Sequence, residues 1–322
     1  MIPTPSGPLA LALAVALSLC LSPGLSPHAG ANPLGSLAPV PACDGPPPRI
    51  TQFGDAATTS TTVPVLGWRE NLAFDGRGRM WVSSVLGDRV EAFDASGRRV
   101  ATVRIASPGG VAVTPAGDVV VVTGALPTAP HSAIYAFDPD VADPTPRLVA
   151  TLPAGKNGLA VDAAGNMYTT GTFAPTVTKV RPDGSVDADW SARAAVFGTN
   201  GIAIRGDTAV VSVTTSVDTV IHELPLGDPA AGRATVVTRL PDVPRGLDDL
   251  AVTDRAIYTV GWTGGEVLRL DRATGAACVL AAGIPAPTSV RVAEGFGTYG
   301  HTDLFVTSAD GSIRHLATGR PA

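Results

Sequence analysis

The chain has 322 residues, a net charge of −5 and only 16% charged residues. Lys156 and Lys179 are its two lysines, and its arginines are scattered rather than clustered. A nucleic-acid partner needs a basic face that neutralises phosphates. We therefore expect no nucleic acid among the partners of this protein.

The amino-terminal region predicts export. Residues 9–21 read LALALAVALSLCL, an apolar run that is too short for a membrane span but suits the core of a signal peptide. Small residues at 29–31 match a cleavage site, so we predict a signal peptide over 1–31 and a secreted or otherwise extracytoplasmic protein. Cys20 follows Leu19, which is too bulky for a usual lipobox, so a lipid anchor is not expected. No second segment has the length of a membrane span.

The rest of the chain repeats one pattern. Residues 32–49 form a proline-rich lead-in, and 50–322 contain six copies of a five-residue motif that opens an apolar strand. The motifs begin at Glu70, Gly109, Asn157, Asn200, Asp248 and Thr288. Each is followed by a turn and further strands rich in Val, Ile and Thr. Spacings of 39 to 48 residues suit blades of four strands, so the sequence predicts an all-β, six-bladed β-propeller with four-stranded antiparallel blades.

The last strand of each blade and the closure of the ring can also be predicted. Five fourth strands are expected, at Arg99–Ile105, Arg147–Leu152, Ser185–Trp190, Ala234–Leu240 and Ala276–Ala281. The sixth blade lacks one, and residues 49–53 would supply it. Cys43 would then lie beside the outer strand of the last blade, and Cys278 on that of the blade before. We predict a disulfide between them, and the alternative is two unpaired, partly buried cysteines.

The inner strands of a propeller line its central channel, and their first residues meet at one mouth. The first motif positions are Glu70, Gly109, Asn157, Asn200, Asp248 and Thr288, and the second are Asn71, Gly110, Gly158, Gly201, Asp249 and Ser289. We read the later positions as apolar. Oxygen side chains without His or Cys favour a hard cation, Ca²⁺ first and Mg²⁺ or Mn²⁺ as alternatives, over zinc or copper. The predicted ligands are Glu70, Asn157, Asn200 and Asp248. The alternative for the two Asn-Gly pairs is an ordinary hairpin turn.

These residues resemble the senescence-marker-protein, gluconolactonase and regucalcin family and, more distantly, the paraoxonases. The resemblance implies that Glu70, Asn200 and Asp248 bind a catalytic divalent metal, usually calcium, and that Asn157 contacts metal or substrate. It also implies hydrolysis of a lactone or an ester. The chain departs from paraoxonases at Gly109-Gly110, where they carry a catalytic His. It also lacks a convincing counterpart of the arginine that the family's sugar-lactone enzymes use.

The loops at the same mouth suggest what surrounds the site. They are mostly apolar, and we predict that Phe173 and Trp262 face a hydrophobic or mixed small-molecule ligand. His131 is the candidate auxiliary acid or base, and the alternative is an exposed loop histidine. Lys156 and Arg245 precede motif strands, where they could pair with an anion, although solvated side chains are the more common outcome.

Two functions of different class follow. The first is a metal-dependent hydrolase, in which the cation stabilises the oxyanion and Asp249 or Asp248 is the base for the attacking water. The second is a non-catalytic exported propeller that binds a ligand or protein and carries a structural Ca²⁺. A lyase or isomerase on the same metal site is a third option. We expect a monomer in each case.

Overall fold

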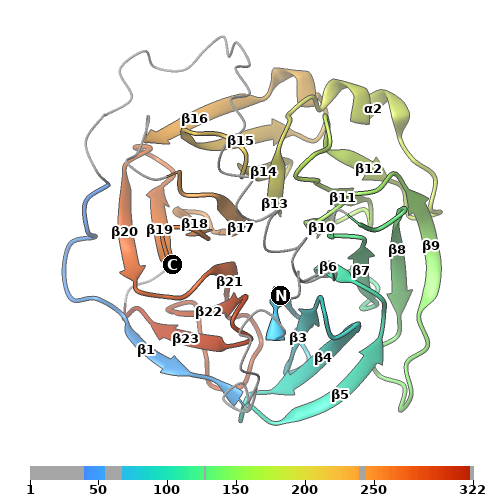
Figure 1. Ribbon diagram of the computed structural model, residues 1–322, viewed down its shortest axis with the longest axis horizontal. Coiled ribbons are helices and arrows are strands. Elements are labelled where there is room, and N and C mark those ends of the chain that lie inside the picture. Colours follow the sequence, from blue (N-terminus) through green and yellow to red (C-terminus); the bar gives the residue numbers. More distant parts are fainter. Residues whose placement is uncertain (1–39, 55–66, 127, 239–243, 320–322) are drawn as a thin grey trace, which may run out of the picture.

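The computed structural model describes residues 40–54, 67–126, 128–238 and 244–319. Within these ranges, six antiparallel sheets stand around a central axis and form a six-bladed β-propeller (Figure 1), which confirms the predicted fold. The predicted signal peptide, 1–31, and the first part of the lead-in lie outside the described residues. No described helix has the length and the apolar character that crossing a membrane requires.

Each blade runs from an inner strand at the axis to an outer strand at the rim. The first three blades are β2 (Arg69–Phe74), β3 (Arg79–Ser84), β4 (Arg89–Asp94), β5 (Arg99–Arg104); β6 (Pro108–Val113), β7 (Val119–Thr123), β8 (Ser132–Phe137), β9 (Arg147–Leu152); and β10 (Leu159–Val161), β11 (Met167–Thr169), β12 (Thr178–Val180). The last three are β13 (Thr199–Arg205), β14 (Thr208–Val213), β15 (Thr219–Pro225), β16 (Arg233–Thr238); β17 (Leu247–Val252), β18 (Ala256–Gly261), β19 (Glu266–Asp271), β20 (Ala277–Ala282); and β21 (Pro287–Val292), β22 (Asp303–Ser308), β23 (Ile313–Ala317), β1 (Arg49–Gln52). A 3₁₀ turn, η3 (Pro229–Ala231), joins β15 to β16.

Blade three differs from the prediction. The expected fourth strand, Ser185–Trp190, is wrong, because only Val186 bridges to β12 and helix α2 (Ala188–Arg193) follows. The carboxylate of Asp187 accepts a hydrogen bond of 3.2 Å from the backbone N–H of Trp190 and so caps the helix. The indole of Trp190 then packs edge-on against Tyr168, with ring centroids 5.1 Å apart. Capping and aromatic packing therefore replace the edge strand.

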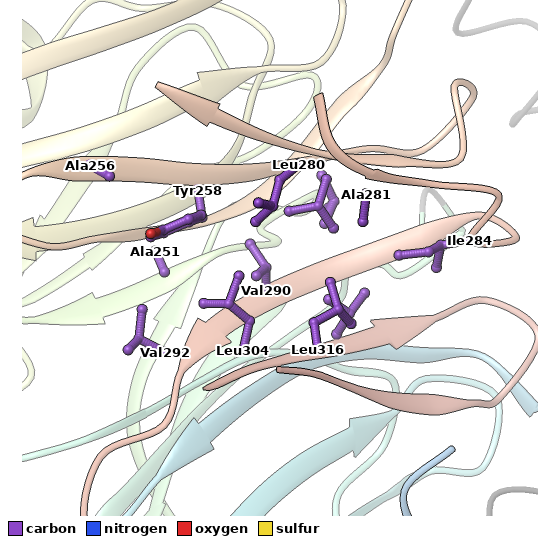
Figure 2. Packing of buried hydrophobic residues seen from close by; sticks show 13 residues of the cluster. Ala251, Ala256, Tyr258, Leu280, Ala281, Ile284, Val290, Val292, Leu304 and Leu316 are labelled. Carbon is purple, nitrogen blue, oxygen red and sulfur yellow. The ribbon is translucent and has the colours of Figure 1, made fainter. Parts of the chain in front are cut away.

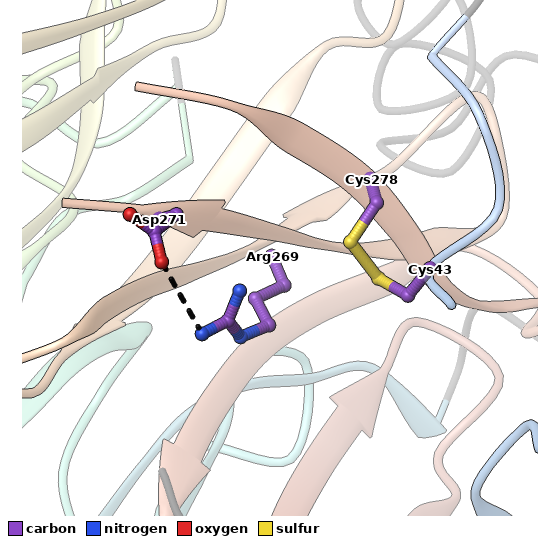
Figure 3. Close-up of a disulfide and its surroundings, with 4 residues drawn as sticks. All are labelled: Cys43, Arg269, Asp271 and Cys278. Atoms are coloured by element: carbon purple, nitrogen blue, oxygen red, sulfur yellow. Dashed lines mark ion pairs between the residues drawn. A yellow bond between two sulfur atoms is a disulfide. The ribbon is translucent and has the colours of Figure 1, made fainter. Parts of the chain in front are cut away.

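The amino-terminal strand closes the ring as predicted. β1 pairs with β23, with Ile50 opposite Leu316, and lies outside it at the rim of blade six (Figure 1). Residues 41–43 run parallel to β20, and the N–H of Cys43 donates to the carbonyl of Val279 at 2.9 Å. Cys43 thus lies against blade five, one blade earlier than expected, because the chain reaches blade six only at β1. The predicted disulfide with Cys278 is confirmed (Figure 3).

Apolar side chains between neighbouring blades hold the ring together. Figure 2 shows the cluster between blades five and six, where Tyr258 and Leu280 face Val290, Leu304 and Leu316. All five side chains are almost completely buried. Burying one large apolar side chain contributes on the order of 1.5–3 kcal/mol to folding, so such an interface fixes the relative positions of adjacent inner strands.

Candidate functional site

The inner strands begin with a β-bulge. In blades one, two, four, five and six, the register between the inner and second strands shifts at the start of the motif, for example between Leu247 and Leu250. Regular strands direct successive side chains to opposite faces, whereas a bulge re-aims one of them. Two consecutive polar residues, such as Asp248 and Asp249, can therefore both contribute to the end of the channel.

Glu70 and Asn157 meet across the ring. The Nδ2 of Asn157, in blade three, donates to Glu70 Oε1, in blade one, at 2.9 Å. The indole Nε1 of Trp68 donates to Glu70 Oε2 at 2.5 Å. Both site residues are buried. Because the amide nitrogen of Asn157 is the group that faces Glu70, its amide oxygen remains available as a ligand.

The carboxylates at the mouth act on one another electrostatically. Burial raises the pKa of Asp248 well above its usual value, and the charges of Glu70 and Asp249 raise it further. Burial also raises the pKa of Glu70, which hydrogen bonds from Asn157 and Trp68 partly offset and the charge of Asp249 reinforces. The site therefore keeps two carboxyl groups away from water, where a cation would offset the cost of ionising them.

The backbone of every predicted ligand is held by the blade that precedes it around the ring. The hydroxyl of Thr170, on blade three, donates to the carbonyl of Asn200, and that of Ser212, on blade four, to the carbonyl of Asp248. Thr307, on blade six, donates to the Glu70 carbonyl at 3.4 Å. The N–H of Gly110 donates to the Asn157 carbonyl at 2.6 Å.

These hydroxyl residues were missed by the sequence reasoning. The residue paired with the third motif residue is followed by a hydroxyl residue in four blades. These are Ser83, Ser212 and Thr307 in the second strands, and Thr170 directly after β11. Their recurrence was a detectable signal, but Ser and Thr in a strand are ordinarily taken as strand formers.

Replacing Ser212 by Ala tests this support. We expect a loss of about 1 kcal/mol in the free energy of unfolding, because Ser212 also accepts from the N–H of Gly201 at 2.9 Å. Binding of a calcium ion by Asp248 would weaken several-fold, since the Asp248 backbone loses its donor; calorimetric titration measures this. Ser84→Ala, a buried serine that no described site carbonyl contacts, is the control. Equal calcium affinity in the two variants would contradict the positioning role.

The glycines at the second motif position allow the inner strands to approach closely. A Cβ on Gly201 would meet the backbone of Asp249 and, at 2.8 Å, the carbonyl oxygen of Asp248. A Cβ on Gly158 would meet the carbonyl of Asn200 in the same way. Gly201 lies within β13, and Asn157-Gly158 leads into β10. The alternative of a hairpin turn at these two pairs is therefore wrong.

A second polar layer lies beneath the first. Asp249 Oδ2 accepts from Asn71 Nδ2 at 2.7 Å and from Ser289 Oγ at 2.6 Å. Arg291 Nη1 lies 2.5 Å from the same oxygen. Arg291 occupies the fourth motif position of blade six, so our reading of the later motif positions as apolar is wrong there.

The donor set fits a hard divalent cation. Glu70 and Asp248 supply two carboxylates, and Asn157 and Asn200 supply two buried amides from other blades. Within the described ranges, no group of three or more His, Cys, Asp or Glu side chains is placed to hold a metal ion. A cation here would therefore depend on the amide oxygens as well as on the carboxylates.

The remaining predicted residues, His131, Phe173 and Trp262, lie in loops between strands. His131 lines an open cavity of about 530 Å³ between blades one and two, and none of the four predicted ligands lines it. Phe173 is half exposed, in the loop between β11 and β12. Trp262 lies in the loop between β18 and β19, and its buried Nε1 has no hydrogen-bond partner among the described residues. Contact of Phe173 and Trp262 with a ligand stays a prediction.

Lys156 and Arg245 are not solvated as expected. Lys156 is buried, its Nζ donates to Thr178 Oγ1 at 2.7 Å, and burial lowers its pKa to about 8. Arg245 forms an ion pair with Glu266. Each cationic side chain therefore has a partner on the third strand of its own blade, Thr178 for Lys156 and Glu266 for Arg245.

Solved structures share this fold. A gluconolactonase from Xanthomonas campestris superposes with a TM-score of 0.59 at 20% identity, covering 88% of this chain and 98% of its own. An auxiliary nutrient-binding protein from Bacteroides ovatus gives a TM-score of 0.64 at 15% identity, covering 83% and 76%. Virginiamycin B lyase from Staphylococcus aureus gives 0.55 at 11% identity, covering 77% and 80%. No protein-family model matches the chain, and no curated protein matches it either.

Identities this low show the fold alone. The three proteins have different descriptions, a lactonase, a binding protein and a lyase, at similar structural likeness. The function must therefore be argued from the side chains at the mouth of the channel.

Proposed function

We propose that the protein is an exported, divalent-metal-dependent hydrolase of a lactone or an ester. The observation that carries the proposal is the pair of buried carboxylates Glu70 and Asp248, which come from different blades. Burial and the nearby charge of Glu70 raise the pKa of Asp248. Asn157 and Asn200 complete a set of hard oxygen donors, for which Ca²⁺ is the first candidate and Mg²⁺ or Mn²⁺ the alternatives. The disulfide is in keeping with an extracytoplasmic protein.

Each residue has a distinct task in this reaction. A cation held by Glu70, Asn157, Asn200 and Asp248 would polarise the substrate carbonyl. Asp249 has Oδ2 engaged by three donors, while its buried Oδ1 has no partner among the described residues and can accept a proton from water. The half-exposed ring of Phe173 would contact an apolar part of the substrate.

The second candidate is a non-catalytic propeller that binds a small molecule and carries a structural cation. It is favoured by the engagement of Asp249, since Asn71, Ser289 and Arg291 all contact one oxygen of that carboxylate and hold it within the protein. It is also favoured by the position of His131, which lines a cavity that none of the four predicted ligands lines.

A substrate panel separates the two candidates. The purified protein is assayed on lactones and aryl esters of increasing apolar length, with calcium and with chelator. We expect hydrolysis that chelator abolishes and calcium restores, and a loss of at least a hundredfold in kcat/KM for Asp249→Asn. Absence of turnover on the whole panel, with calcium shown to be bound, would favour the binding propeller.

Calcium should raise the melting temperature, and more so at higher pH. At a hundred times Kd, bound calcium adds about 2.7 kcal/mol, or roughly 5–10 °C for a domain of this size. The pKa values of Glu70 and Asp248 are raised in the folded state, so without metal their ionisation lowers stability as pH rises through the folded values. Calcium offsets this cost, so its effect should grow from pH 4 to pH 7.

Scanning calorimetry at several pH values measures the shift. Glu70→Gln should abolish it, whereas Asp254→Asn, at an exposed carboxylate, should keep it. A calcium shift of the same size in Glu70→Gln as in the wild type would show that the ion binds elsewhere.

A further inference from the structure

One position of the inner-strand motif breaks the sixfold pattern. The fourth motif residues are Ala73, Ala112, Ala160, Ala203, Ala251 and Arg291. From this position the Arg291 side chain reaches the second motif residue of blade five, Asp249, and that of its own blade, Ser289. Five blades carry an alanine here, packed in or against the apolar clusters, whereas the sixth carries an arginine whose guanidinium reaches Asp249.

Arg291 joins the inner strands of three blades. Its Nη1 lies 2.5 Å from Asp249 Oδ2 and donates to the carbonyl of Leu250 at 2.7 Å, both in blade five. Its Nη2 donates weakly to Asn71 Oδ1, in blade one, at 3.4 Å. The carboxylate of Asp249 is 2% exposed and the side chain of Arg291 is 17% exposed. Breaking such a buried pair leaves an uncompensated charge.

The two oxygens of the Asp249 carboxylate have different contacts. Oδ2 accepts from Asn71 and Ser289 and faces Arg291, whereas Oδ1 is buried without a partner among the described residues. Three anchors on one oxygen fix the orientation of the carboxylate. The free oxygen is therefore presented in one direction rather than shared among rotamers.

The formal charges of the buried carboxylates also indicate a role for Arg291. Glu70, Asp248 and Asp249 are three buried carboxylates that act on one another electrostatically. One divalent cation balances two of them, and one guanidinium balances the third. Buried charges are costly unless they are paired, so Arg291 makes the site electrically suited to a single divalent cation.

We propose that Arg291 is a positioning residue, the internal counter-ion that keeps Asp249 out of the cation's ligand set and holds its Oδ1 free. The part concerning the cation rests on the proposed function. The part concerning Asp249 does not, because it follows from contacts among the protein's own residues.

A double-mutant cycle in chelator tests the pairing without any metal. Arg291→Met should lower the melting temperature by roughly 10 °C, because it strands the Asp249 charge. Arg291→Met with Asp249→Asn should regain at least half of that loss, since the stranded charge is gone. Additive losses would overturn the proposal. Arg314→Met, in the ion pair with Asp310 of the same blade at 3.0 Å, is the control and should lose less.

Calcium titration of the same variants tests the ligand set. Arg291→Met should bind calcium at least tenfold more tightly than the wild type, because a third carboxylate becomes available. The double variant and Arg291→Lys, which keeps the positive charge and is the variant to use if Arg291→Met does not fold, should both match the wild type. Unchanged affinity in Arg291→Met, or tighter binding in Arg291→Lys, would overturn the proposal. Absence of calcium binding in every variant would overturn the proposed function, whereas the cycle in chelator would still decide the pairing.

Discussion

Replacing Cys43 and Cys278 by serine is expected to lower the free energy of unfolding by about 5 kcal/mol. The two cysteines are 235 residues apart, so their bond removes a very large loop from the freedom of the unfolded chain. For a domain of this size the melting temperature should fall by roughly 10–20 °C. Calorimetry of the double serine variant, and of the wild type under reducing conditions, measures the loss.

Arg269→Gln is the matched control for the disulfide variant. Arg269 lies directly opposite Cys278 in the sheet, and its ion pair with Asp271 is 3.8 Å long (Figure 3). A loose pair near the surface contributes less than about 1 kcal/mol. A double serine variant that melts within 2 °C of this control would show that β1 alone keeps the ring closed.

Gly201→Ala is expected to destabilise the fold by about 3 kcal/mol and to weaken calcium binding at least tenfold. The added methyl group would press on the backbone of Asp248 and Asp249, with its Cβ 2.8 Å from the Asp248 oxygen. Backbone atoms in a paired strand have little room to retreat, so blade five must shift away from blade four. The shift would carry the two carboxylates with it.

Gly227→Ala makes the same change where no atom lies within 4 Å of the new Cβ, in an exposed turn. It should leave both the melting temperature and the calcium titration within error of the wild type. If Gly201→Ala behaved like Gly227→Ala, the close approach of blades four and five would not be a requirement of the site.

The fold was predictable because its repeats are explicit. A motif that recurs in one register fixes the number of inner strands, and the missing last strand requires a partner from the front of the chain. The same register predicted that Cys43 and Cys278 are close. Blade three was the exception, because Asp187 and Trp190 stabilise a helical turn through contacts that strand propensity does not register.

The candidate site was only partly predictable. The aligned motif positions indicate metal ligands, but not the residues that hold those ligands in place. The motif indicated Glu70 and Asn157, whose contact the structure shows. Ser212 and Thr170 act on the next blade, a role that their recurrence after the second-strand pairing position could have indicated but that no single strand shows by itself. Arg291 was treated as part of an apolar motif, although it is the one charged residue at the fourth motif position, where the other five blades carry alanine.

The strap formed by residues 41–43 and β1 has a consequence for the order in which the protein assembles. Its partners, β20 and β23, are made last, and Thr51 meets His315 across a separation of 264 residues. Contacts between such distant segments form slowly, because the loop between them must close first. Until then blade six lacks its outermost strand, β1, and the outer strand of blade five, β20, lacks its bridge to residues 41–43. The bond between Cys43 and Cys278 can form only when residues 41–43 have met β20, so oxidation of this pair marks the molecules in which the amino-terminal segment has reached blade five.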